Sequence, residues 1–292
     1  MIEMPFEPDA VIGADWLELS CFLDYPTPIS KIAVEGYFDL EFAEPELLSS
    51  DIFRHIEWRK AMSPNYPFYV SDAAIHSKSG VYSAMEYLFP LLLSTHDFYQ
   101  ETRILNWSQV GDLFELFCTA SMTQLVGNAV LIGNKFGGFS RRFDKCLEEM
   151  CNVINERKGP PHPKANDFQD AGVDIVAWRK FDKRKGQIVL LVQCASGMNW
   201  RKKGGDIKPK LWNELVFWTV DPIKALTFPY AFDFDSPEAE EDWSFYAYDS
   251  GLLFDRLRLS NFKMSECKLN LDPIREWAKK QMGALKSHQI AL

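Results

Sequence analysis

The feature that most constrains the fold of this chain is the stretch of residues 170–203, DAGVDIVAWRKFDKRKGQIVLLVQCASGMNWRKK. Two apolar runs, residues 173–178 and 187–194, flank a charged turn that contains Gly186. Continuous apolar runs rich in Val and Ile are typical of central strands that are buried on both faces of a sheet. We therefore predict a β-hairpin at the centre of a β-sheet.

One residue of the first run, Asp174, is a carboxylic acid among apolar neighbours. Burying an ionised carboxylate is costly unless an opposite charge or hydrogen-bond donors stabilise it. The second run ends in a polar stretch that contains Gln193. If the two strands pair across their short turn, Asp174 and Gln193 lie at neighbouring positions. We therefore predict a polar site at this end of the hairpin.

The clearest helical pattern lies earlier in the chain, at residues 108–125, SQVGDLFELFCTASMTQL. Its apolar residues recur with a period near 3.6, and Ser108 is a suitable N-cap. Glu115 lies beside this apolar stripe, where it is either an ordinary flanking carboxylate or a side chain that reaches the sheet. Together with Asp174 and Gln193 it would supply hard oxygen ligands suited to Mg²⁺ or Mn²⁺.

The segment after the second strand is basic. A lysine beside a metal-carboxylate site can orient or deprotonate a water molecule and stabilise the charge of a pentavalent phosphate. Residues farther along such a segment suit contacts with nucleic-acid phosphates, although a solvated basic loop is the alternative interpretation. The candidates are Lys202 and Lys203 for catalysis, and Arg201, Lys208 and Lys210 for phosphate contact.

Three motifs in this order, GDLFELF, AGVDIVAW and LVQCASG, resemble the PD-(D/E)XK nuclease superfamily and its Mrr-like branch. The resemblance covers about residues 108–232 and implies a restriction-endonuclease-like fold and metal-dependent DNA cleavage. It implies that Glu115, Asp174 and the backbone carbonyl of Cys194 hold the metal, and that Gln193 belongs to the catalytic set. It also implies a role in a bacterial anti-phage or restriction system.

One position departs from the superfamily pattern, because the lysine expected two residues after Gln193 is Ala195. Either the lysine has migrated to Lys203 or Lys202, or the active site is degraded. A helix that begins near Ser196 would favour Lys203. The principal hypothesis is a DNA endonuclease, and the alternative is a nuclease-fold subunit that binds nucleic acid or assembles with other proteins.

Composition limits the partners and the location. The net charge is −9 over 292 residues, so DNA binding would require a local basic patch, a protein partner or a homo-oligomer. The six cysteines show no CxxC or metal-ligand spacing, which predicts reduced thiols in a cytoplasmic protein. We expect no signal peptide and no membrane partner, and the chain has no Walker A, GxGxxG, GxSxG or HExxH motif.

The complete pattern predicts an α/β fold with a central mixed sheet flanked by helices. Residues 106–292 would form the restriction-endonuclease-like domain with a C-terminal helical extension, and residues 1–105 an α+β subdomain for interaction or as a lid. Trp200 is expected to pack structurally rather than to stack on a base. Other predicted elements are helices at residues 10–23, 45–55 and 273–286, strands at 31–42 and 223–232, and an acidic loop at 236–243.

Overall fold

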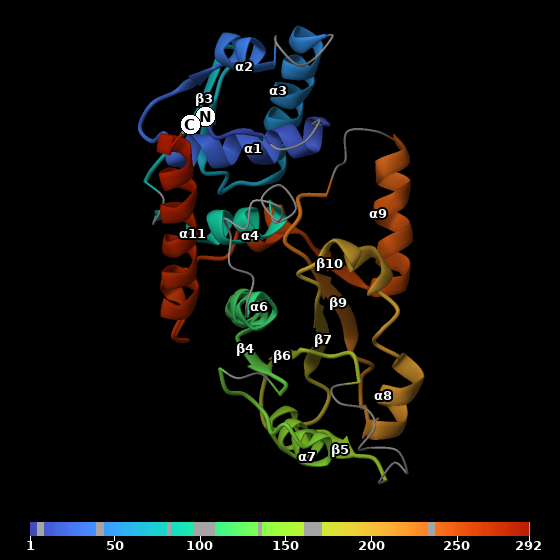
Figure 1. Ribbon diagram of the computed structural model, residues 1–292. Coiled ribbons are helices and arrows are strands. Elements are labelled where there is room, and N and C mark those ends of the chain that lie inside the picture. The colour runs from blue at the N-terminus through green and yellow to red at the C-terminus, as the bar shows by residue number, and fades with distance from the viewer. Residues whose placement is uncertain are drawn as a thin grey trace.

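The computed structural model describes residues 1–4, 9–38, 44–80, 83–95, 109–133, 136–160, 171–232 and 237–291. Its centre is a five-stranded mixed sheet with the strand order β10-β9-β7-β6-β4 (Figure 1). β4, β6 and β7 are antiparallel, whereas β7, β9 and β10 are parallel. The predicted central hairpin is therefore confirmed. The strands are β4 (Asn128–Leu131), β6 (Ile175–Arg179), β7 (Ile188–Cys194), β9 (Ile223–Thr227) and β10 (Leu252–Phe254).

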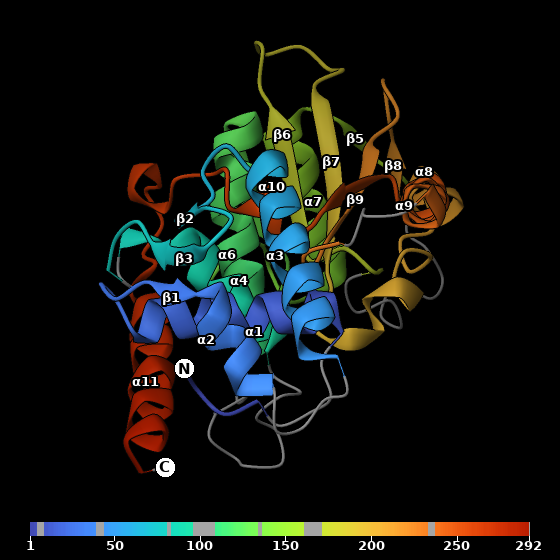
Figure 2. The ribbon, with the colours of Figure 1, turned by 90° about the horizontal axis from the view of Figure 1, so that it is seen from above.

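Helices cover both faces of this sheet, which confirms the predicted α/β class (Figure 2). Leu190 and Val192 of β7 pack in the same cluster as α6 (Val110–Val126), whereas Leu191 packs with α7 (Phe143–Ile154) and α8 (Pro209–Leu215). Successive strand residues point to opposite faces, so both faces of a central strand must be apolar.

The first third of the chain contains four helices and a small sheet among its described residues. A three-stranded sheet with the order β1-β3-β2 packs with helices above the central sheet (Figure 1). The strands are β1 (Ile29–Ser30), β2 (Phe68–Val70) and β3 (Ala74–Ser77), and the helices are α1 (Ala10–Leu23), α2 (Lys31–Phe38), α3 (Pro45–Met62) and α4 (Met85–Ser94).

Two sequence predictions of secondary structure are wrong. The predicted strand at residues 31–42 is α2 as far as Phe38, because Ser30 Oγ accepts a hydrogen bond from the Ala33 amide at 3.1 Å and caps a helix. The predicted acidic loop contains the start of α9 (Pro237–Ser250). Its proline at the first turn and its early glutamates suit a helix N-terminus, where the helix dipole favours negative charge.

The remaining elements complete the second half of the chain. The predicted strand at residues 223–232 ends at Thr227, before Pro229, because proline cannot donate to a sheet ladder. Ser108, the predicted N-cap of α6, lies outside the described residues. The other elements are β5 (Arg157–Lys158), β8 (Val216–Phe217), the 3₁₀ turns η3 (Met198–Lys202) and η4 (Met264–Glu266), and the helices α10 (Arg256–Leu259) and α11 (Asp272–Ala291).

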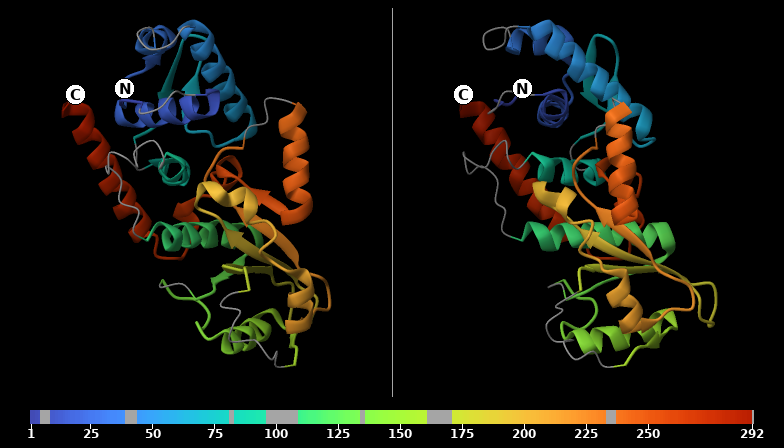
Figure 3. Two further views of the ribbon diagram at one scale, coloured as in Figure 1. Left: turned by 45° about the vertical axis from the view of Figure 1, so that its right-hand side comes forward. Right: turned by 90° about the vertical axis from the view of Figure 1, so that its right-hand side faces the viewer.

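One hydrophobic cluster joins the two halves of the chain, since it contains buried residues of α1, α3, α4, α6 and α11. Figure 3 shows α11 beside both the N-terminal helices and α6. The predicted domain boundary near residue 105 lies outside the described residues. No helix in the described ranges combines the length and the apolar character needed to cross a membrane.

Candidate active site at the end of the central sheet

Asp174 directly precedes β6 and lies between two neighbouring strands. Its backbone N–H donates to Val192 O at 2.9 Å, and its backbone carbonyl accepts from the Ile132 amide at 2.8 Å. Its side-chain Oδ2 accepts the N–H of Cys194 at 2.6 Å. Because strand N–H groups lie near the plane of the sheet, this bond holds the carboxylate between β6 and β7 rather than above either face. A charge-assisted bond of this kind stabilises the half-buried carboxylate.

The glycine two residues before Asp174 has a structural role in this fold. Gly172 has φ of +78°, and a Cβ at this position would lie 2.6 Å from the backbone oxygen of Asp206. Only glycine accepts both the left-handed conformation and this close approach. Gly172 therefore lets the segment before Asp174 pack directly on the loop that carries Asp206.

Gln193 is buried beside Asp174, with 6% of its surface exposed. Its Nε2 donates to Asp206 Oδ2 at 2.9 Å, which fixes the orientation of the amide because a carboxylate must face a donor. Its Oε1 has no hydrogen-bond partner among the described residues. A buried acceptor without a partner costs roughly 1–3 kcal/mol, so this oxygen marks a place where a ligand would be favourable.

Asp206 also contacts one of the two candidate lysines. Lys203 Nζ lies 3.3 Å from Asp206 Oδ2, and both side chains are partly exposed. Lys202 is exposed. The structure thus brings Lys203 toward Gln193 through Asp206. The sequence analysis missed Asp206, and its only local signal was an acid three residues after Lys203 in a glycine-containing basic loop.

Helix α6 is attached to the same end of the sheet. Cys118 Sγ donates to Thr227 Oγ1 at 3.2 Å, and Thr227 Oγ1 donates to Gln193 O at 3.2 Å. Glu115 lies almost one turn before Cys118 on α6 and is half-buried. Residues three apart on a helix are neighbours on its surface, so Glu115 lies on the side of α6 that reaches the ends of these strands.

The charges of both predicted carboxylates influence the Cys194 thiol. Burial raises the pKa of the Cys194 thiol well above its ordinary value, and a hydrogen bond with Cys118 raises it further. The negative charges of Asp174 and Glu115 also raise this pKa. Two carboxylates that act on the same thiol lie at the same end of the sheet, Asp174 in its plane and Glu115 on the α6 side.

Ala195, where the resemblance leads us to expect a lysine, is buried in the core. Ala195 is 4% exposed and shares a cluster with Trp200. Trp200 is 2% exposed and stacks on Phe228 with ring centroids 3.9 Å apart and an interplanar angle of 10°. Trp200 is therefore structural, as predicted.

The three predicted phosphate-contact residues, Arg201, Lys208 and Lys210, are all exposed, and the Arg201 guanidinium lies 4.7 Å from the centroid of the Trp200 ring. Their contact with nucleic acid stays a prediction.

Within the described ranges, no group of three or more His, Cys, Asp or Glu side chains is placed to hold a metal ion. The predicted ligand set is of a different kind, because it combines two carboxylates with an amide oxygen and the Cys194 carbonyl.

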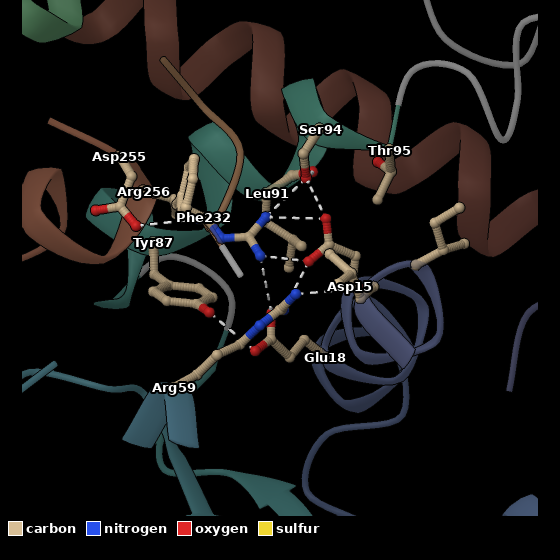
Figure 4. A network of polar contacts seen from close by, with 12 residues as sticks. Asp15, Glu18, Arg59, Tyr87, Leu91, Ser94, Thr95, Phe232, Asp255 and Arg256 are labelled. Carbon is tan, nitrogen blue, oxygen red and sulfur yellow. Dashed lines mark hydrogen bonds and ion pairs between the residues drawn. The ribbon is translucent and has the colours of Figure 1, made fainter. Parts of the chain in front are cut away.

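A second polar cluster, which the sequence analysis did not anticipate, lies in the N-terminal half of the structure (Figure 4). Arg59 Nη1 lies 2.6 Å from Asp15 Oδ1 and 3.0 Å from Glu18 Oε2. Arg256, which comes from the C-terminal half of the chain, also pairs with Asp15 and Glu18. We call these four residues the buried ion network.

Neutral side chains complete the buried ion network. Ser94 Oγ donates to Asp15 Oδ2 at 2.7 Å, while the hydroxyls of Tyr66 and Tyr87 donate to Glu18 Oε1 at 2.6 and 2.8 Å. The pKa of Asp15 is lowered far below its ordinary value, because the charges of Arg256 and Arg59 outweigh the opposing effect of burial. These side chains are enclosed and paired with one another, so the network connects α1, α3, α4 and α10.

Comparisons with known proteins do not assign this chain to a family. No family model, curated protein or solved structure matches it. What the structure itself defines is a mixed α/β protein with a polar cluster at one end of its central sheet.

Proposed function

We propose that this protein is a metal-dependent DNA endonuclease with its active site at the end of β6 and β7. The observation that carries the proposal is the buried Gln193 Oε1, which has no hydrogen-bond partner in the described part of the chain and lies next to Asp174. Apart from the intervening α7, β5, η3 and β8, the chain order is α6-β4-β6-β7-α8-β9, which is what we expect for a restriction-endonuclease-like core and supports this proposal.

Glu115, Asp174 and the Cys194 carbonyl would hold Mg²⁺ or Mn²⁺, since hard cations prefer oxygen ligands. The chemistry of the donor set fits such an ion, because it combines two carboxylates and a backbone carbonyl with the buried amide oxygen of Gln193. When bound, the metal supplies Lewis-acid activation of water and of the phosphate.

The other residues position the reactants. Gln193 Oε1 accepts a hydrogen bond from the attacking water, and Lys203 stabilises charge on the phosphate from its position beside Asp206. The exposed Arg201, Lys208 and Lys210 contact the DNA backbone, with a protein partner or a second copy compensating for the net charge of −9. A cytoplasmic effector of bacterial defence is the setting that we propose.

A second candidate function is a non-catalytic nuclease-fold subunit that binds nucleic acid or assembles with other proteins. Two observations favour it: Ala195 is packed in the core where the superfamily has its lysine, and Lys203 is paired with Asp206. In that case the carboxylates of Glu115 and Asp174 would be retained without a chemical role.

Plasmid nicking with Mg²⁺ or Mn²⁺ tests the proposal. We expect the wild-type protein to convert supercoiled DNA to nicked or linear forms, and Asp174→Ala to be at least about 100-fold slower, as for the loss of a key electrostatic group. Asp182→Ala is the matched control, because Asp182 is an exposed acid in the turn at the far end of the same hairpin. If wild-type protein and Asp174→Ala are equally active, or if neither cleaves DNA, the endonuclease proposal is wrong.

A further inference from the structure

A cavity of about 250 Å³ lies between α3, α9 and α10, apart from the site around Asp174. It is smaller than the roughly 300–1,000 Å³ typical of drug-sized sites, so it suits a single planar ring system. Its lining is mostly aromatic and apolar but includes two charged side chains. The lining residues are Trp58, Met62, Phe232, Trp243, Asp255, Leu257 and Arg258.

Aromatic side chains form part of the walls of this cavity. Trp243 of α9 meets Phe232 edge to face, with ring centroids 5.1 Å apart and an interplanar angle of 78°. The guanidinium carbon of Arg258 lies 4.7 Å from the centroid of the Trp243 ring. Trp58 lines the cavity from α3. Indole rings with an adjacent guanidinium are suited to stacking on a planar, electron-rich ring.

The acidic side chain in the cavity lining is Asp255, which is 4% exposed. Its Oδ1 accepts the Arg258 amide at 2.9 Å, and its Oδ2 accepts the Phe232 amide at 3.2 Å. Each carboxylate oxygen can accept two hydrogen bonds, so each retains capacity for a donor from a ligand. Burial raises the pKa of Asp255, which means that a ligand with N–H donors would relieve an unfavourable environment.

This cavity and Asp174 lie at the same end of the central sheet. In the sheet register Cys194 is opposite Thr227, and Thr227 is opposite Phe254, the residue before Asp255. Neighbouring strands are about 4.8 Å apart, so Phe254 lies roughly 10 Å from Cys194, whose N–H binds Asp174. A strand of nucleic acid that is bound at Asp174 and runs along this end of the sheet would therefore reach the cavity within a few nucleotides.

The buried ion network holds the cavity walls in position. Arg59 directly follows Trp58, and Arg256 directly follows Asp255. Both arginines pair with Asp15, and Figure 4 shows Arg256 directed to the network while Asp255 is directed away from it, toward Phe232. The network thus fixes the position of α3 relative to α10. Because Trp58 lies on α3 and Asp255 directly precedes α10, it also fixes these two lining residues relative to each other.

We propose that this cavity binds one unstacked nucleobase of the substrate strand, an inference that rests on the proposed nuclease function for its substrate. The Trp243 and Trp58 rings stack on the base, Asp255 accepts hydrogen bonds from its pairing edge, and Arg258 attracts the adjoining phosphate. Guanine fits best, because its N1–H and its amino group are adjacent donors that match the two oxygens of a carboxylate.

Equilibrium binding of nucleoside monophosphates, without added metal, tests this proposal on the full-length Asp174→Ala protein. We expect saturable GMP binding, detected by calorimetry and by quenching of tryptophan fluorescence. IMP lacks the amino group of GMP and is expected to bind about tenfold more weakly, as is usual for the loss of a hydrogen bond to a charged group.

Two variants separate stacking from recognition of the base edge. Trp243→Ala should weaken GMP binding about tenfold or more, whereas Trp243→Phe should retain part of it. Asp255→Asn can still cap α10 and should remove the preference for GMP over IMP. The thermal midpoint of each variant shows whether it is folded.

The proposal is overturned if no nucleoside monophosphate binds at millimolar concentration, or if folded Trp243→Ala binds GMP as tightly as its parent. It is also overturned if N-acetyltryptophanamide binds while the nucleotides do not, since the occupant would then be an aromatic peptide side chain. GMP binding by a protein that never nicks plasmid DNA would refute the endonuclease but not the base-binding cavity.

Discussion

Two groups of polar side chains lie in this molecule in very different surroundings. In the buried ion network, Arg59 and Arg256 have no exposed side-chain surface, and each pairs with Asp15 and Glu18. At the end of the central sheet, Lys203 and Asp206 have side chains that are 42% and 40% exposed. The network thus excludes water, whereas the cluster at the sheet end is open to solvent.

We expect this difference to separate a structural role of the network from the proposed chemical role of the sheet end. Enclosed and mutually paired charges specify how two segments of chain pack together, because any other arrangement would leave a buried charge without compensation. An open cluster that contains a buried acceptor, Gln193 Oε1, without a partner among the described residues instead has capacity for a ligand. Stability measurements and activity measurements should therefore respond to different residues.

The largest expected effect is on stability, from removing one cation of the buried ion network. Arg256→Met leaves Asp15 and Glu18 with one cation, and we expect the free energy of unfolding to fall by about 3–5 kcal/mol in urea titrations. The control is Arg275→Met, because the Arg275–Asp272 pair is exposed and should contribute less than about 1 kcal/mol. Equal effects of the two variants would show that the network has no special structural role.

The next effect is on activity, at the open cluster. Lys203→Met should slow plasmid nicking roughly 100-fold, because it removes the cation held beside Gln193 by Asp206. Lys202→Met should have a smaller effect, and Lys185→Met, in the distant hairpin turn, should have none. A larger loss in Lys202→Met than in Lys203→Met would show that Lys202, not Lys203, has the proposed catalytic role.

The pH dependence of stability should come from the N-terminal half. His55 is 1% exposed, and burial, followed by the charge of Arg59, lowers its pKa to about 3. Between pH 6.5 and 3 the unfolded chain binds a proton that the folded state excludes, so stability falls as the pH falls, by about 1.4 kcal/mol per unit. Asp15 contributes little between pH 6.5 and 5, because its stabilising effect is lost only as the pH falls through the unfolded pKa of about 3.9 toward its lowered folded pKa.

Urea titrations at pH 6.5 and pH 5 would measure this dependence. His55→Gln should remove a difference of about 2 kcal/mol between the two values of pH, whereas His76→Gln, which replaces a half-buried histidine of β3, should preserve it. If folded His55→Gln shows the same difference in unfolding free energy between pH 6.5 and pH 5 as the wild type, another group is responsible for the pH dependence.

The smallest expected effect is the change in stability on substituting Gln193, which we compare with Gln187, a second buried glutamine just before the other end of β7. Gln187 uses both side-chain atoms, since its Oε1 accepts the Phe181 amide at 2.7 Å and its Nε2 donates to Arg184 O. Gln187→Met should therefore destabilise the protein by about 1–3 kcal/mol. Gln193→Met removes the amide oxygen that lacks a partner in the described ranges, and this offsets the lost Nε2 hydrogen bond to Asp206, which is partly exposed and keeps its contact with Lys203. The free energy of unfolding should therefore change by less than about 1 kcal/mol while nicking is lost. A large loss of stability in Gln193→Met would indicate a structural role.

The sequence predicted part of the polar cluster at the end of the central sheet. This was possible because the antiparallel pairing of β6 and β7 follows from the apolar pattern of two segments that are close together in the chain. Two apolar runs around a short turn predict a hairpin, and the hairpin brings Asp174 to Gln193 and Cys194. The same kind of pattern failed at residues 31–42, where a side-chain cap from Ser30 selects a helix. Short segments contain too few residues for periodicity to decide against a cap.

Local pattern by itself determined the central hairpin, the amphipathic helix α6 and the location of an acid at the start of β6, because these depend on residues close together in the chain. Only the tertiary structure decided which charges are enclosed and which stay open. Asp15 and Arg256 are 241 positions apart, and Gln193 meets Asp206 through a loop packed against Gly172. Electrostatic pairing depends on distance in space, and no spacing along the chain encodes contacts of this range.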